Sequence, residues 1–170
     1  DAIEQIFELL FTRVFRDVQP QALSVSQFNE PTTRELEHDY LWRVLNSLPK
    51  RGQIGVFNRS HYEEVIVTRV HPELIMEQNL PGINHPDDVN AEFWMKRFEQ
   101  INNYEKHLNQ NGYLIIKVFL HMSKEKQRQR FLRRIRRNDK HWKFEFKDIQ
   151  ERQYWQSYQY AYEDALKHTS

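Results

Sequence analysis

Short apolar runs alternate with helical stripes along this chain of 170 residues. The runs at 22–28, 53–57 and 113–122 have the length and apolar content of strands, and the last is the strongest. Helices are predicted around them, at 3–15, 32–49, 60–70, 90–110, 124–137 and 148–168. Strands that alternate with helices favour a parallel sheet with crossover connections. The predicted fold class is therefore α/β, with the run at 53–57 buried on both faces.

The length suits one domain, which we expect to span residues 1–170. The chain has no cysteine, and this excludes disulfides and metal sites built from cysteine. No apolar run approaches the ~20 residues of a membrane-spanning helix. No secretory signal precedes the first predicted helix, so we expect a cytoplasmic protein that has no membrane partner.

Positive charge is concentrated in the segment Lys124–Lys143. This segment holds ten Lys and Arg against two acids, whereas the rest of the chain holds 15 basic and 22 acidic residues. Helical spacing places four of its arginines on one face: Arg130, Arg133, Arg134 and Arg137. Because like charges on one face repel, the segment favours a bound polyanion. Nucleic acid is the alternative occupant, since Trp142 can stack on a base.

Polar residues follow the predicted strand at 53–57, where ligands bind in parallel sheets. Arg59 can form a bidentate contact with a phosphate at the start of the next helix. Glu63 and Glu64, one turn further along, offer carboxylates to Mg²⁺. A capped surface helix that begins at Ser60 explains the same residues equally well. The polar residues from Thr32 to Arg43 fit a surface helix better than a pocket.

Several stretches of this sequence resemble, in order, motifs of the polyphosphate kinase 2 family, which transfers phosphoryl groups between polyphosphate and nucleotides. They include Phe28-x-x-Pro31-Thr32, Glu37-His38-Asp39-Tyr40-Leu41-Trp42-Arg43 and Gly52-x-Ile54-Gly55-x-Phe57-Asn58-Arg59-Ser60-x-Tyr62. Further matches are Phe93-Trp94, Gln100-Ile101-Asn102, Phe119-Leu120-His121, Lys140-x-Trp142-Lys143-Phe144 and Tyr160-x-x-Tyr162-Glu163-Asp164-Ala165-Leu166. The resemblance covers nearly the whole chain.

This resemblance implies a P-loop kinase-like three-layer sandwich with a parallel sheet and a helical lid at about 124–147. It implies Mg²⁺ as cofactor, polyphosphate as donor, AMP or ADP as acceptor, and a homo-oligomer, either dimer or tetramer. The expected catalytic residues are Asn58, Arg59, Arg134 and Glu64, of which the first three match positions of the family's motifs. The implied phosphate-binding residues are Arg130, Arg133, Arg137, Lys140 and Lys143. The implied nucleotide pocket holds Asp39, Arg43 and Tyr62, and the implied metal ligands are Asp1 and Glu64.

Two departures from the family pattern bear on activity. Many members have Asp where this chain has Asn58, and a neutral amide lacks that charge, so Glu64 becomes the expected metal-site carboxylate. The family's phosphate-binding loop, Gly-x-Asp-x-x-Gly-Lys, and its last strand and helix are absent from these 170 residues, and we expect them to lie outside the given sequence. A true deletion of the loop would abolish catalysis. The alternatives to an enzyme are a non-catalytic polyphosphate-binding domain and a nucleic-acid-binding domain.

Overall fold

The computed structural model describes residues 13–136 and 146–170, without the side chains of 134–136 and 146–148. The contacts of the chain divide it into two compact units. One unit holds residues 17–114 and 158–170, and the other holds Ile115–Ser157 and the residues before Asp17. The single domain expected over residues 1–170 stays a prediction.

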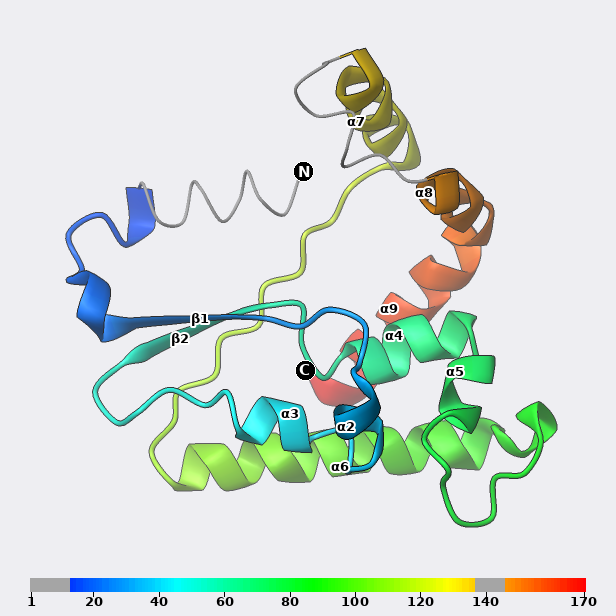
Figure 1. Ribbon diagram of the computed structural model, residues 1–170, viewed down its shortest axis with the longest axis horizontal. Coiled ribbons are helices and arrows are strands. Elements are labelled where there is room, and N and C mark those ends of the chain that lie inside the picture. The colour runs from blue at the N-terminus through cyan, green and yellow to red at the C-terminus, as the bar shows by residue number, and fades with distance from the viewer. Residues whose placement is uncertain (1–12, 137–145) are drawn as a thin grey trace. The chain divides into compact units, whose positions relative to one another are not determined.

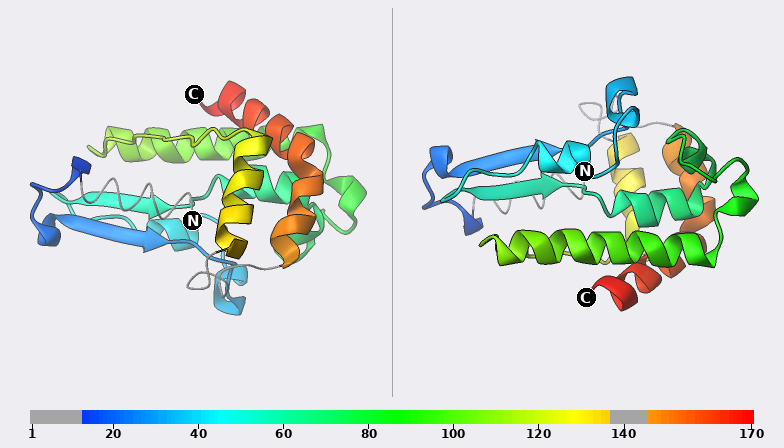
Figure 2. Two further views of the ribbon diagram at one scale, coloured as in Figure 1. Left: turned by 90° about the horizontal axis from the view of Figure 1, so that it is seen from above. Right: turned by 90° about the horizontal axis from the view of Figure 1, so that it is seen from below.

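The larger unit contains a parallel pair of strands, β1 (Leu23–Gln27) and β2 (Ile54–Asn58). Figures 1 and 2 show the two arrows side by side and pointing the same way. Both strands confirm the predicted runs, and their register pairs Leu23 with Ile54 and Gln27 with Asn58. The expectation that β2 is buried on both faces is wrong, because Ile54 is 42% exposed.

The strand predicted at Tyr113–Met122 is also wrong. Among the described residues, the only sheet is the β1–β2 pair, and this segment belongs to no helix or strand. Its apolar side chains are exposed, with Leu114 at 83% and Ile116 at 76%. A strand requires a neighbouring backbone for its hydrogen bonds, and an apolar pattern by itself does not supply one.

Short helices follow each strand of the pair. After β1 come α2 (Thr33–Leu36) and α3 (Trp42–Leu45), where one continuous helix from Thr32 to Pro49 was predicted. The helix breaks because the Asp39 carboxylate accepts the backbone N–H of Leu41 at 2.9 Å, and such a local bond competes with helical bonding. After β2 come α4 (Glu63–Val70) and α5 (Glu73–Met76), and the short 3-10 helices are η2 (Pro20–Ala22) and η3 (Pro86–Asp88).

The core of this unit forms around the long helix α6 (Ala91–Gln110), which confirms the predicted helix at 90–110. Asn90 caps it by accepting the backbone N–H of Phe93 at 3.1 Å, and Gly112, with φ at 86°, follows its end. The α6 side chains Phe98 and Ile101 are 2% and 0% exposed. They belong to one apolar cluster with residues of α4, α5 and the last helix, namely Val65, Ile66, Ile75, Ala161 and Ala165.

The smaller unit contains helix α7 (Lys124–Arg136), as predicted for the basic segment, and Ser123 accepts the backbone N–H of Lys126 at 3.2 Å. The final helix predicted at 148–168 is interrupted: α8 (Phe146–Glu151) and η5 (Arg152–Tyr154) belong to the smaller unit, whereas most of α9 (Trp155–Thr169) belongs to the larger one. The first predicted helix, at 3–15, lies almost entirely outside the described residues. None of the described helices has the length and apolar character needed to cross a membrane.

Candidate active site

Residues with functional side chains gather at the carboxyl ends of β1 and β2. The register pairs Gln27 with Asn58, and the backbone N–H of Phe28 donates to the Asn58 carbonyl at 3.1 Å. The two strands therefore end side by side. The residues that follow β1 and those that follow β2, beginning with Arg59, consequently share one edge of the sheet, the edge at which parallel sheets bind ligands.

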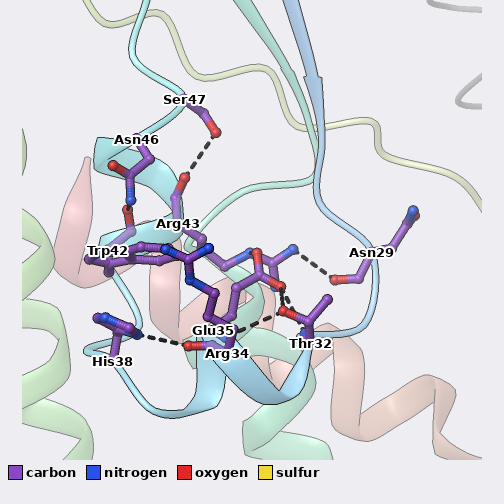
Figure 3. Close-up of polar contacts among 9 residues, drawn as sticks. All are labelled: Asn29, Thr32, Arg34, Glu35, His38, Trp42, Arg43, Asn46 and Ser47. Carbon is purple, nitrogen blue, oxygen red and sulfur yellow. Dashed lines mark hydrogen bonds and ion pairs between the residues drawn. The ribbon is translucent and has the colours of Figure 1, made fainter.

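Arg43 is the best-anchored cation at this edge (Figure 3). Its Nη2 donates to the carbonyl of Asn29, just after β1, at 2.9 Å, and its Nε lies 3.2 Å from a carboxylate oxygen of Glu35. Its guanidinium also lies 5.0 Å from the ring centre of Phe28. These contacts leave the Arg43 side chain only 15% exposed, so its charge is fixed in place.

Glu35, the partner of Arg43, is itself fixed by the capping box of α2. The Thr32 hydroxyl accepts the Glu35 backbone N–H at 3.3 Å, and the Thr32 backbone N–H donates to Glu35 Oε2 at 2.8 Å. Burial tends to raise the pKa of Glu35, but the Thr32 hydrogen bonds and the charge of Arg43 outweigh it and lower that pKa. The predicted capping signature is therefore confirmed, and it also positions an arginine (Figure 3).

Arg59 is presented differently, because its backbone is in the left-handed region with φ at 62°. A residue other than glycine seldom adopts this conformation, and such outliers occur often at functional sites. The Arg59 guanidinium lies 3.7 Å from Glu63, but its side chain is 49% exposed. An exposed ion pair at this distance is weak, so Arg59 is free to contact another anion.

Tyr62 and His61, which follow Arg59, are turned toward α6 instead of solvent. The Tyr62 hydroxyl donates to Glu105 at 3.0 Å, and His61 Nε2 lies 3.5 Å from the same oxygen. The ring of His61 lies 5.4 Å from that of Tyr104, at a nearly perpendicular angle. Tyr62, predicted for a nucleotide pocket, thus also holds the loop after β2 against α6.

Glu64 belongs to a chain of polar contacts beneath this edge. Gln78 Nε2 donates to Glu64 Oε2 at 2.6 Å, and Gln78 Oε1 accepts from Arg97 Nη2 at 2.5 Å. Burial raises the pKa of Glu64, although Arg97, the Gln78 hydrogen bond and Arg43 all oppose the shift, while Asp39 adds to it. The Gln78 amide therefore links a carboxylate to a guanidinium that is itself only 3% exposed.

The structure thus brings most of the predicted residues of the larger unit together. Arg59 and, more weakly, Arg43 oppose the rise in the pKa of Glu63 that burial causes, which means that both cations act on one carboxylate. The positions predicted in the basic segment belong to the smaller unit: Arg130 is partly buried and Arg133 is exposed on α7. The Arg134 side chain, Arg137, Lys140, Lys143 and Asp1 lie outside what the structure describes.

A metal site made only of protein ligands is not found in the described part of the chain, which holds no group of three His, Asp or Glu suited to an ion. Mg²⁺ is commonly held by one or two carboxylates together with substrate phosphates and water. Glu64 lies beside the cationic edge, because the charges of both Arg43 and Asp39 influence the pKa of its carboxylate. It therefore fits the role of one carboxylate in a site of that kind.

Gln78 and Arg97 are the residues that the sequence analysis missed. Arg97 lies one position before Phe98 and three after Trp94, both of which are buried on α6. An arginine between two core positions of a helix needs an internal partner, and this spacing is the signal that was available. Gln78 carries no such signal, because it lies in the irregular connection after α5.

Comparison with known proteins decides the family. The family model described as polyphosphate kinase 2 matches residues 10–170. This chain belongs to the polyphosphate kinase 2 family. The resemblance inferred from the sequence motifs is therefore confirmed.

Related proteins of the polyphosphate kinase 2 family are considerably longer than this chain. An ADP-polyphosphate phosphotransferase of Rhodopseudomonas palustris is 48% identical over 157 residues, which are 92% of this chain and 53% of that protein. An AMP/ADP-polyphosphate phosphotransferase of Meiothermus ruber is 42% identical, with the same coverage. The chain thus spans about half the length of these curated relatives.

The fold agrees with solved structures of polyphosphate kinase 2 proteins. The crystal structure of polyphosphate kinase 2 from Arthrobacter aurescens matches with a TM-score of 0.81 and 35% identity, over 95% of this chain and 52% of that one. The mixed helix and strand fold with a parallel sheet is therefore that of the family.

Proposed function

We propose that the protein transfers a phosphoryl group from inorganic polyphosphate to AMP or ADP. The observation that carries this proposal is the placement of Arg43 and Arg59 at one sheet edge, because Arg43 contacts Asn29 just after β1 and Arg59 directly follows β2. Two cations from separate elements at the carboxyl ends of parallel strands suit a chain of phosphates. The relatives named as ADP- and AMP/ADP-polyphosphate phosphotransferases support the same substrates.

The reaction breaks the bond between the terminal phosphorus of polyphosphate and its bridging oxygen. A terminal phosphate oxygen of the nucleotide forms the new bond, and the polyphosphate leaves one unit shorter. In such transfers the protein mainly positions the reactants and neutralises charge. Arg43 supplies a fixed charge because Glu35 and Asn29 hold it. Arg59, half exposed, contacts the phosphates directly.

The remaining site residues are assigned roles on the same basis. Asn58 ends β2 beside Arg59, while Asp39, Arg43 and Tyr62 are proposed to border the nucleotide. A bound Mg²⁺ would neutralise charge on the phosphates, with Glu64 as one of its carboxylates and Asp1 as a second. The lid is proposed to add phosphate contacts from Arg130, Arg133, Arg134, Arg137, Lys140 and Lys143.

The complete protein is proposed to be a P-loop kinase-like three-layer sandwich that assembles as a homo-oligomer. The parallel β1–β2 pair and the match to polyphosphate kinase 2 structures support this architecture. Exposed apolar residues of the pair, such as Val25 at 52%, also suit a larger sheet than the described one, because parallel sheets are generally covered on both faces.

An activity assay tests the proposal directly. Full-length protein is incubated with polyphosphate, Mg²⁺ and either ADP or AMP, and new ATP or ADP is measured. We expect product to form, and Arg59→Ala to lower kcat/KM by at least about a hundredfold, as loss of a charge-stabilising group does. Arg51→Ala is the matched control, because Arg51 precedes the opposite end of the same strand. Absence of product with both nucleotides contradicts the proposal.

A further inference from the structure

A cavity of about 350 Å³ opens in the larger unit between the α2–α3 turn, the connection after α5, and α6. Its size falls in the range of about 300–1,000 Å³ that is usual for small-molecule sites. The walls that matter for recognition are Asp39, Tyr40, Phe93, Lys96, Arg97 and Gln100. Of the residues proposed above to border the nucleotide, Asp39 lines this cavity, whereas Arg43 and Tyr62 do not.

The charges around this cavity argue against a polyphosphate or a phosphate group as occupant. Its lining holds three acids, Asp39, Asp88 and Glu92, against two bases, Lys96 and Arg97. Lys96 lies 2.7 Å from Glu92, and Arg97 is joined to Glu64 through Gln78. Lys96 thus has an acidic partner, Arg97 is linked to one through the neutral Gln78, and the lining holds one more acid than base, so an uncharged occupant fits best.

Flat groups line the same space. The Arg97 guanidinium lies 4.1 Å from the centre of the Tyr40 ring and 5.2 Å from that of Phe93. Arg97 is 3% exposed, and its Nη1 has no hydrogen-bond partner within the described structure. Arg97 thus supports the Tyr40 ring from within the protein, and the rings of Tyr40 and Phe93 are surfaces on which a planar heterocycle stacks.

Gln100 supplies an amide group that can form hydrogen bonds with the edge of such a heterocycle. Its Oε1 accepts from the Tyr40 hydroxyl at 3.2 Å, and this bond fixes which end of the amide is turned away from Tyr40. The amide nitrogen, with its two N–H donors, can therefore donate to an acceptor atom on a ligand. A purine or pyrimidine base carries such acceptors on its edge.

The cavity also borders the proposed phosphate site. Arg97 lines the cavity and donates to Gln78, which in turn binds Glu64, and the neighbouring Glu63 lies 3.7 Å from Arg59. A heterocycle in the cavity would thus be near phosphates held by Arg59. We propose that the cavity binds the base of the acceptor nucleotide and that Gln100 determines which base is preferred. This inference rests on the proposed function.

The first test compares bases under turnover. The kcat/KM values for ADP, GDP, CDP and UDP are measured with polyphosphate and Mg²⁺, for the wild type, Gln100→Leu and Tyr40→Phe. Loss of the Gln100 amide is expected to change the ratios of kcat/KM between the nucleotides by about tenfold. Loss of the Tyr40 hydroxyl should change these ratios in the same direction but by a smaller factor. Gln110→Leu, an exposed substitution on the same helix, is the matched control and should leave the ratios unchanged.

The second test uses adenosine and uridine, which carry no phosphate, and measures binding by saturation-transfer NMR. Adenosine or uridine should bind to the wild type and bind at least about tenfold more weakly to Gln100→Leu. If neither binds, or if Gln100→Leu changes neither binding nor base ratios, the inference is wrong. If adenosine binding depends on Gln100 but no nucleotide is phosphorylated, the proposed function fails while the cavity assignment stands.

Discussion

The amide nitrogen of Gln78 donates to the Glu64 carboxylate at 2.6 Å, although the two residues belong to different segments of the larger unit. The other end of the same amide accepts from the buried Arg97. One neutral side chain therefore satisfies an acid and a base at once. A contact of this kind fixes the loop after α5 to both α4 and α6, the helices that support the candidate site.

Replacing Gln78 by Met should therefore destabilise the protein while keeping its volume. The Glu64 carboxylate and Arg97 Nη2 both lose their amide partner, and a buried polar group left without one costs about 1–3 kcal/mol. Urea unfolding of the full-length protein measures this loss. Gln110→Met, at the exposed end of α6, is the control and should change the free energy of unfolding by less than about 0.5 kcal/mol. Equal effects of the two substitutions would show that the amide link contributes nothing.

Glu64 should make stability depend on pH in a defined direction. Burial raises its pKa above the ordinary value of 4.5, against the opposing effect of Arg97. The folded state thus binds this proton more tightly than the unfolded state, so the stabilisation is fully present below pH 4.5 and is lost as pH rises through the folded pKa.

Glu64→Gln removes this titration, and the comparison of the two proteins isolates it. The free energy of unfolding of the variant, minus that of the wild type, should rise as pH increases from about 4 and level off above the folded pKa. Chemical unfolding at a series of pH values measures this difference. A difference that stays constant or falls with pH contradicts the assignment.

The fold could be predicted from sequence where the signals were local. Helix α6 was predicted at its observed limits because Asn90 caps it and Gly112 follows its end. The strand expected at Tyr113–Met122 was wrong because pairing depends on a neighbour that a local pattern does not reveal. The break between α2 and α3 comes from a single side-chain bond of Asp39, which an apolar stripe does not show.

Site residues that belong to a sequence motif could be predicted. Residues whose role depends on tertiary contacts could not. Arg43 and Arg59 were named from motifs, and the register of the sheet explains why they act together. Arg97 and Gln78 were missed because their importance lies in contacts between segments far apart in sequence. The contribution of the lid residues to this site stays a prediction.

Arg43→Lys tests whether the guanidinium has a structural role besides its charge. Lysine keeps the positive charge, but a single ammonium does not reproduce the arrangement in which Nη2 donates to Asn29 and Nε faces Glu35. We expect the free energy of unfolding to fall by about 1–3 kcal/mol, as for lost hydrogen bonds to charged groups. The same change at Arg34, which is exposed over the Trp42 ring, is the control and should have little effect. Calorimetry or urea unfolding of both variants decides this.

Arg59 combines strain in the backbone with a charge at the site, and two substitutions separate them. Arg59→Ala and Arg59→Gly both remove the guanidinium, so both should reduce turnover to the same extent. They differ in the backbone, because φ at 62° disfavours alanine by roughly 1–2 kcal/mol but does not disfavour glycine. Glycine loses about 0.5–1 kcal/mol more chain entropy on folding, which offsets part of this strain, so Arg59→Gly should be the more stable variant by roughly 0.5–1 kcal/mol.

The same pair of substitutions at Arg51 provides the control for this measurement. Arg51 is not among the residues with positive φ, so alanine should be at least as stable there as glycine. The order of stability should thus be reversed between the two ends of β2, as read from thermal or urea unfolding. If Arg59→Ala proves as stable as Arg59→Gly, the left-handed conformation does not strain the loop, and Arg59 is placed at the sheet edge by its side-chain contacts alone.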